Sequence, residues 1–152
     1  MKIYVDADAC PVKNIIVNLA KERKIPVVMV CDTSHILNDG YSEIITVDKA
    51  ADSADLVLIN LLKKGDIVIT QDYGVGCLAI SKGAYALNQN GVLYSDDNID
   101  RMLFERFLSK KVRSSGGKTK NQPKRSLKDN SSFENAFRKL LNEVLNNGTE
   151  EN

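Results

Sequence analysis

The chain alternates short apolar runs with segments in which apolar residues recur every three or four positions. Apolar runs at 2–5, 27–31, 44–47 and 67–70 predict β-strands, and the unbroken run at 27–31 is typical of a strand covered on both faces. The periodic segments at 12–24, 52–63 and 73–81 predict helices. A repeating order of strand and helix predicts right-handed crossovers, and therefore a three-layer α/β fold with a mostly parallel central sheet of four to five strands.

The second half of the chain predicts a less regular arrangement. Short strands at 85–87 and 92–94 flank an Asn-Gly turn, and a helix over 99–109 closes an α/β domain that spans residues 1–109. Residues 110–130 are basic, polar and aperiodic, which predicts a flexible segment. Residues 131–147 form an amphipathic helix that docks either on the same domain or on a second subunit, so a homodimer is possible.

Acidic residues follow two of the predicted strands and begin a predicted helix. Asp6 and Asp8 follow the first strand, Asp52 and Asp55 begin the middle helix, and Asp72 follows the fourth strand. The carboxyl ends of parallel strands meet at the edge where open α/β sheets bind ligands. Carboxylates gathered there repel one another unless protons or a divalent cation neutralise them. The sequence therefore predicts a Mg²⁺ or Mn²⁺ site made by these five residues.

Each of these acids also has a structural interpretation. Asp6 and Asp8 could simply form a turn before Pro11, because Asp commonly starts turns. Asp52, Asp55 and Asp72 could cap helices. The joint occurrence of three such motifs favours one shared site, since every structural interpretation would have to hold independently.

This donor set suits hydrolysis of a phosphodiester. Such a reaction needs neutralisation of anionic charge and deprotonation of water near neutral pH, which carboxylate-bound Mg²⁺ or Mn²⁺ provides. We expect Asp6 and Asp72 to be catalytic, and Thr70, two residues before Asp72, to contact a phosphate oxygen of the substrate.

Charge is unevenly distributed along the chain. The formal net charge is +1, yet residues 110–128 hold eight Lys or Arg and no acid, so the rest of the chain carries about −7. Phosphate contacts from this segment would give salt-dependent binding without base recognition, whereas a solvated charged linker is the competing interpretation. The basic residues predicted to bind substrate are Lys118, Lys120, Lys124 and Arg125.

Hydropathy argues against a membrane protein. No stretch reaches the roughly 20 apolar residues that a membrane span needs, and residues 1–8 lack the features of a signal peptide. We therefore expect a cytoplasmic protein with no membrane partner.

The motifs VDADACP, ADSAD, GDIVITQDYG and ALNQNG, in this order, resemble the uncharacterised bacterial YaiI/YqxD family. That family is similar to the PIN-like superfamily, which implies a Rossmann-like fold and a metal-dependent ribonuclease. The resemblance implies that Asp6, Asp55 (or Asp52) and Asp72 are the clustered acids, and that Asp8 belongs to the family's own motif. RNA is then a more probable partner than DNA.

Two other functions remain open. A phosphatase of the haloacid-dehalogenase kind would use Asp6 as nucleophile, Asp8 as acid, Thr70 to bind phosphate and Lys82 as charge partner, with metal acids at Asp96 and Asp97. A non-catalytic nucleic-acid-binding module would depend on the basic segment alone.

Overall fold

The computed structural model describes residues 1–8, 10–32, 38–48, 54–114 and 124–150. Its centre is a five-stranded, all-parallel sheet in the order β3-β2-β1-β4-β5. The strands are β1 (Ile3–Asp6), β2 (Val27–Asp32), β3 (Glu43–Val47), β4 (Ile67–Ile69) and β5 (Tyr85–Leu87). The predicted α/β class and parallel sheet are confirmed.

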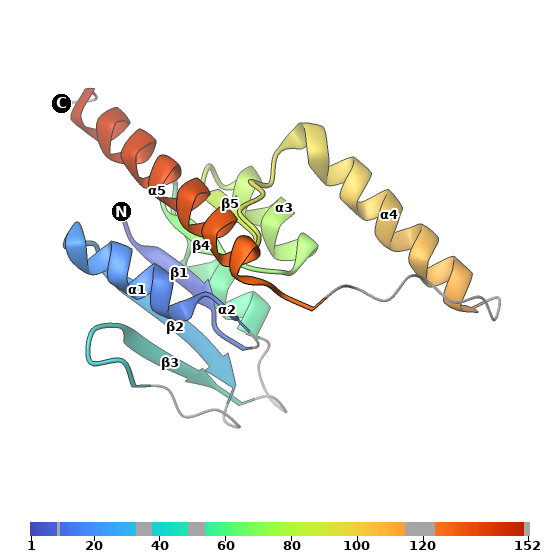
Figure 1. The fold of residues 1–152 in the computed structure, drawn as a ribbon, viewed down its shortest axis with the longest axis horizontal. Coiled ribbons are helices and arrows are strands. Elements are labelled where there is room, and N and C mark those ends of the chain that lie inside the picture. The colour runs from blue at the N-terminus through green and yellow to red at the C-terminus, as the bar shows by residue number, and fades with distance from the viewer. Residues whose placement is uncertain (9, 33–37, 49–53, 115–123, 151–152) are drawn as a thin grey trace.

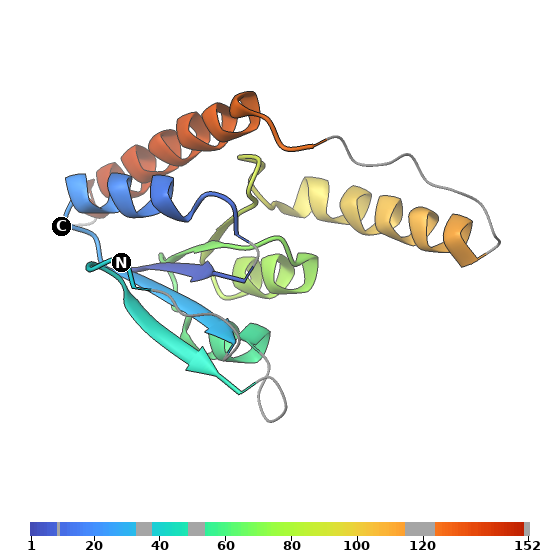
Figure 2. The same cartoon turned by 60° about the horizontal axis from the view of Figure 1, so that its bottom comes forward.

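Helices cover both faces of this sheet, which gives three layers (Figures 1 and 2). On one face lie α1 (Lys13–Glu22) and α5 (Leu127–Glu150), and on the other lie α2 (Ala54–Leu61) and α3 (Tyr73–Ser81). Two buried clusters result because successive strand residues point to opposite faces. Val5 and Ile69 pack in the α1/α5 cluster, whereas Tyr4 and Val68 pack in the α2/α3 cluster.

The C-terminal helix docks on the same domain. Phe133 and Phe137 stack with ring centroids 5.4 Å apart, and both are fully buried with Leu140 and Leu141 against α1 and the sheet. The apolar stripe that suggested a second subunit is therefore covered by the chain's own core. Homodimer formation stays a prediction.

The connection to α5 is more helical than expected. Helix α4 (Asp96–Ser114) extends away from the sheet, and α5 begins at Leu127 (Figure 1). Residues 110–114 and 127–130 were predicted to be flexible and are helical instead. The predicted strand at 92–94 is wrong: Leu93 makes a single antiparallel bridge with Leu87 across the Asn-Gly turn. Within the described ranges, no helix is long and apolar enough to cross a membrane.

Candidate functional site

Asp6 and Thr70 lie side by side at the carboxyl edge of the sheet. β1 and β4 are parallel neighbours, and each of these residues is two positions beyond a strand residue of the α2/α3 cluster, so both face α2 and α3. The Thr70 hydroxyl donates a hydrogen bond to Asp6 Oδ2 at 3.1 Å. Thr70 is 2% exposed. A hydroxyl this buried fixes the orientation of the Asp6 carboxylate, and the expected contact of Thr70 with substrate stays a prediction.

Asp72 is joined to the same pair through its backbone. Its N–H donates to Thr70 Oγ1 at 3.1 Å, and its Oδ1 accepts the Val75 N–H at 3.1 Å as the N-cap of α3. The structural interpretation of Asp72 is thus correct, but it does not exclude a ligand role, since a carboxylate has two oxygens. A Cβ added at Gly74 would lie 3.0 Å from Asp72 Oδ1, so the glycine leaves room for this carboxylate.

Asp55 approaches from the first turn of α2. Burial, the charge of Asp72 and a hydrogen bond with the Asp72 side chain raise the pKa of Asp55 above its usual value. Two carboxylates this close repel each other unless a proton or a cation lies between them. Asp52, the other predicted ligand on this helix, lies outside the described residues.

Electrostatics connect these acids into one cluster, which we call the acidic edge: Asp6, Asp8, Asp55 and Asp72. Burial raises the pKa of Asp6 to about 6; the Thr70 hydrogen bond opposes this, and the charges of Asp55, Asp8 and Asp72 reinforce it. The leading charge effects on Asp6 all come from other carboxylates. The acids that were predicted from the sequence to share one site are therefore close enough in the fold to repel one another.

Asp8 is held differently from the other three acids. Its carboxylate accepts the Asp32 N–H at 3.1 Å, at the end of β2. This bond attaches the loop after β1 to the neighbouring strand. The metal-ligand role predicted for Asp8 stays a prediction.

The acidic edge fits a divalent cation by chemistry. In the part of the chain that the structure describes, no three Asp, Glu, His or Cys side chains stand together closely enough to hold a metal ion. Mg²⁺ nevertheless keeps several waters and is commonly bound by one or two carboxylates together with substrate phosphates. The hydrogen-bonded pair of Asp55 and Asp72 meets that requirement, with Asp6 next to it.

Tyr94 supports this site and was missed from the sequence. Its hydroxyl donates to the Thr70 carbonyl at 3.1 Å, and its ring meets Tyr73 edge-on at 6.0 Å. A Cβ at Gly76 would lie 2.9 Å from the Tyr94 ring, so this glycine permits the close packing. Burial raises the pKa of the Tyr94 hydroxyl, which stays protonated and donates. No local pattern could have linked residues this far apart.

The structure describes two of the four basic residues that were predicted to bind substrate. Lys118 and Lys120 lie outside the described residues, and Lys124 is exposed. Arg125 is held on the turn after β5, where it donates to the Gln89 carbonyl at 2.7 Å and to Asn90 Oδ1 at 2.8 Å.

The phosphatase arrangement is not assembled. Lys82 is the C-cap of α3 and donates to the Ile59 carbonyl. It lies at the opposite end of that helix from Asp72, about 15 Å away along the axis. Asp96 and Asp97 start α4, where the Ser95 hydroxyl accepts the Asn98 N–H at 3.3 Å.

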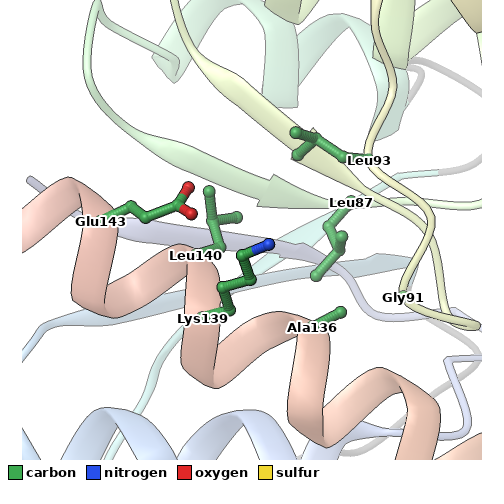
Figure 3. Close-up of a pocket in the computed structure, with 7 residues that line it drawn as sticks. All are labelled: Leu87, Gly91, Leu93, Ala136, Lys139, Leu140 and Glu143. Carbon is green, nitrogen blue, oxygen red and sulfur yellow. The ribbon is translucent and has the colours of Figure 1, made fainter.

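A separate hollow of about 240 Å³ lies between α5 and the β5 edge (Figure 3). Side chains of α5 face Leu87 and Leu93 across it (Figure 3). Its lining contains none of the predicted site residues and consists of Leu87, Gly91, Leu93, Ala136, Lys139, Leu140 and Glu143. Lys139 and Glu143 bring opposite charges to its lining.

Comparison with known proteins identifies the family. The sequence profile described as "Uncharacterized BCR, YaiI/YqxD family" matches residues 4–143. The chain belongs to this family. It is 60% identical over 137 residues to a UPF0178 protein of Ruminiclostridium cellulolyticum, with 90% of each chain covered. A UPF0178 protein of Clostridium acetobutylicum is 54% identical over 143 residues, which cover 93% of this chain and 97% of the relative.

A more distant relative extends the same match. The UPF0178 protein of Natranaerobius thermophilus is 44% identical over 141 residues, covering 93% of this chain and 96% of its own length. No solved structure shows a significant match. The names of these relatives state no activity, so any function has to be argued from the site.

Proposed function

We propose that this protein is a metal-dependent nuclease that hydrolyses RNA phosphodiester bonds at the acidic edge. One observation carries the proposal: carboxylates from β1, α2 and the β4–α3 turn lie together, and their mutual repulsion and burial raise the pKa of Asp6 and of Asp55. Such a cluster costs folding free energy in the absence of a cation. At the edge where parallel sheets bind ligands, this cost is relieved when a cation and its ligand bind to the carboxylates.

The residues that would hold Mg²⁺ or Mn²⁺ are the pair Asp55 and Asp72, with Asp6 next to them. When bound, the ion would neutralise phosphate charge and lower the pKa of a water molecule, which is the chemistry that phosphodiester hydrolysis requires. Asp72 would still cap α3 when it binds the ion, because the capping hydrogen bond from the Val75 N–H uses only one of the two carboxylate oxygens.

The remaining residues set the geometry of these carboxylates. Thr70 donates to Asp6 and accepts from the Asp72 backbone, so a single hydroxyl fixes the separation of β1 from the β4–α3 turn. Tyr94 in turn holds the Thr70 carbonyl. A rigid support of this kind lowers the cost of organising ligands when substrate arrives.

The decisive experiment measures cleavage of end-labelled single-stranded and hairpin RNA with Mn²⁺, for the wild type and for Asp72→Asn. Asparagine keeps the size of the side chain and the capping oxygen while removing the charge. We expect cleavage by the wild type and none by the variant, with a cooperative thermal unfolding transition that shows the variant to be folded.

Asp97→Asn is the matched control. It removes the same charge from an exposed position at the start of α4, outside the acidic edge. It also removes a metal acid that the phosphatase mechanism would need. Full activity in Asp72→Asn would refute the nuclease proposal, and loss of activity in Asp97→Asn alone would favour the phosphatase.

A second function is favoured by one specific observation. Since no three metal-binding side chains converge in the described residues, a non-catalytic nucleic-acid-binding module fits the same fold. RNA binding without cleavage, weakened by salt and unaffected or improved in Asp6→Asn, would support this module over the nuclease.

A further inference from the structure

A half-buried cation lies inside the loop that carries Asp6 and Asp8. Lys13 is the first residue of α1, and its Nζ donates to the Ala7 carbonyl at 3.2 Å. Ala7 is the residue between the two acids, and its own N–H bonds to the Val30 carbonyl at 2.9 Å, which continues the β1–β2 pairing. The Lys13 ammonium group is therefore fixed to the backbone at the acidic edge.

A second half-buried cation is fixed nearby on a different element. Arg125 makes three hydrogen bonds: to the Gln89 carbonyl at 2.7 Å, to Asn90 Oδ1 at 2.8 Å and to Asn130 Oδ1 at 2.8 Å. All three acceptors are neutral. Because a guanidinium has five N–H donors, this leaves Arg125 its charge and two further donors.

Lys13 and Arg125 lie near the starts of two helices that pack against each other, since α1 and α5 both begin at the carboxyl edge of the sheet (Figures 1 and 2). The buried Cys10 donates its backbone N–H to the Ala7 carbonyl, the same oxygen that holds Lys13. Its surroundings include the charges of Lys13, Asp6 and Arg125. Asp6 faces α2 and α3, whereas both cations belong to the starts of α1 and α5 on the other face of the sheet.

We propose that Lys13 and Arg125 form a phosphate-binding site on the α1/α5 side of the acidic edge, which takes a backbone phosphate of a polynucleotide next to the cleaved bond. This inference rests on the proposed function and adds a residue, Lys13, that the charge pattern of the sequence did not single out. The site solves a problem of the nuclease: an edge of carboxylates repels a polyanion, and two fixed cations beside it attract and align the strand. Lysine contributes a point charge, and arginine contributes directed donors.

The test measures binding of a short single-stranded RNA in EDTA over a series of salt concentrations, so that neither metal nor cleavage contributes. The variants are Lys13→Gln, whose amide can still donate to the Ala7 carbonyl, and Arg125→Gln. We expect each to weaken binding at low salt and to lower the slope of log affinity against log salt by about 0.7, the value for one phosphate contact on a single strand. A DNA strand of the same sequence shows whether the site takes any phosphodiester or RNA alone.

Lys63→Gln is the control, because Lys63 is exposed and precedes β4, at the opposite edge of the sheet. Thermal unfolding of each variant shows whether the fold is intact. If Arg125→Gln loosens the turn after β5, Arg125→Lys serves as a second variant, because it keeps the positive charge. Slopes equal to the wild type in both Gln variants, or no salt-sensitive binding by the wild type, would overturn the inference.

The outcomes separate this inference from the nuclease. Lowered slopes without Mn²⁺-dependent cleavage would support the phosphate site and refute the nuclease. Cleavage with unchanged slopes would support the nuclease and refute the phosphate site.

Discussion

A buried and a half-buried carboxylate at opposite edges of the same sheet have opposite surroundings. Asp66, 6% exposed at the amino end of β4, accepts the Lys2 N–H at 3.0 Å and the Lys63 N–H at 2.9 Å. Asp6, at the carboxyl end of β1, accepts one hydroxyl and lies among three other carboxylates. The first acid completes the backbone hydrogen bonding of the fold, and the second weakens the fold unless something binds. The comparison separates a structural acid from a candidate functional one by the partners of each.

Divalent metal should act on only one of these two edges. We expect Mn²⁺ to raise the unfolding temperature of the wild type at neutral pH, with about 2.7 kcal/mol of stabilisation at a hundredfold excess over Kd. Asp72→Asn should lose this response, whereas Asp97→Asn should keep it. Calorimetry with and without Mn²⁺ measures the effect, and an equal response in Asp72→Asn would remove the metal from the acidic edge.

The same substitution at the two acids should change stability in opposite directions. Asp66→Asn leaves one of two partly buried N–H groups without an acceptor, which should cost about 1 kcal/mol. Asp6→Asn removes a half-buried, repelled charge and should stabilise the metal-free protein at neutral pH. Urea unfolding in EDTA tests both variants, and destabilisation of similar size in both would abolish the distinction.

The pH dependence of stability sharpens the argument for Asp6. Its pKa of about 6 in the fold exceeds the roughly 4 of an unfolded carboxyl. Below pH 4 the group is protonated in both states, so it carries no penalty. The penalty grows as the pH rises from about 4 to about 6 and is complete above that. Metal-free wild type should therefore lose stability over this interval relative to Asp6→Asn. Parallel curves for the two proteins, measured by urea unfolding, would contradict the assignment.

A smaller effect is expected at Tyr94, whose hydroxyl donates to the Thr70 carbonyl next to the acidic edge. Tyr94→Phe removes the bond to the Thr70 carbonyl and should cost about 1 kcal/mol. If Tyr94 is a positioning residue, Mn²⁺-dependent cleavage should fall through kcat with little change in KM. Tyr73→Phe, which alters the neighbouring ring of the edge-on pair, is the comparison variant. Unchanged kcat would limit Tyr94 to a structural role.

Much of the fold could be predicted because its signals are local. The limits of α3 and β5 agree with the apolar pattern, and the four acids of the acidic edge were found from their places after strands and at a helix start. In a sequence pattern, glycines at 74 and 76 do no more than weaken the first turn of a helix. The fold shows the reason for them: one leaves space for the Asp72 carboxylate and the other for the Tyr94 ring.

The sequence by itself determined the order of strands and helices and the edge at which the acids gather, because side-chain periodicity and strand direction are properties of short segments. Only the tertiary structure decided which groups from distant segments form hydrogen bonds with one another. Asp66 with the Lys2 backbone, Arg125 with the turn after β5, and Tyr94 with Thr70 are contacts between segments far apart in the chain. Such contacts depend on how elements pack, and no spacing within one segment encodes them. For the same reason Lys13, an ordinary helix lysine in the sequence, becomes a cation of the acidic edge only in the fold.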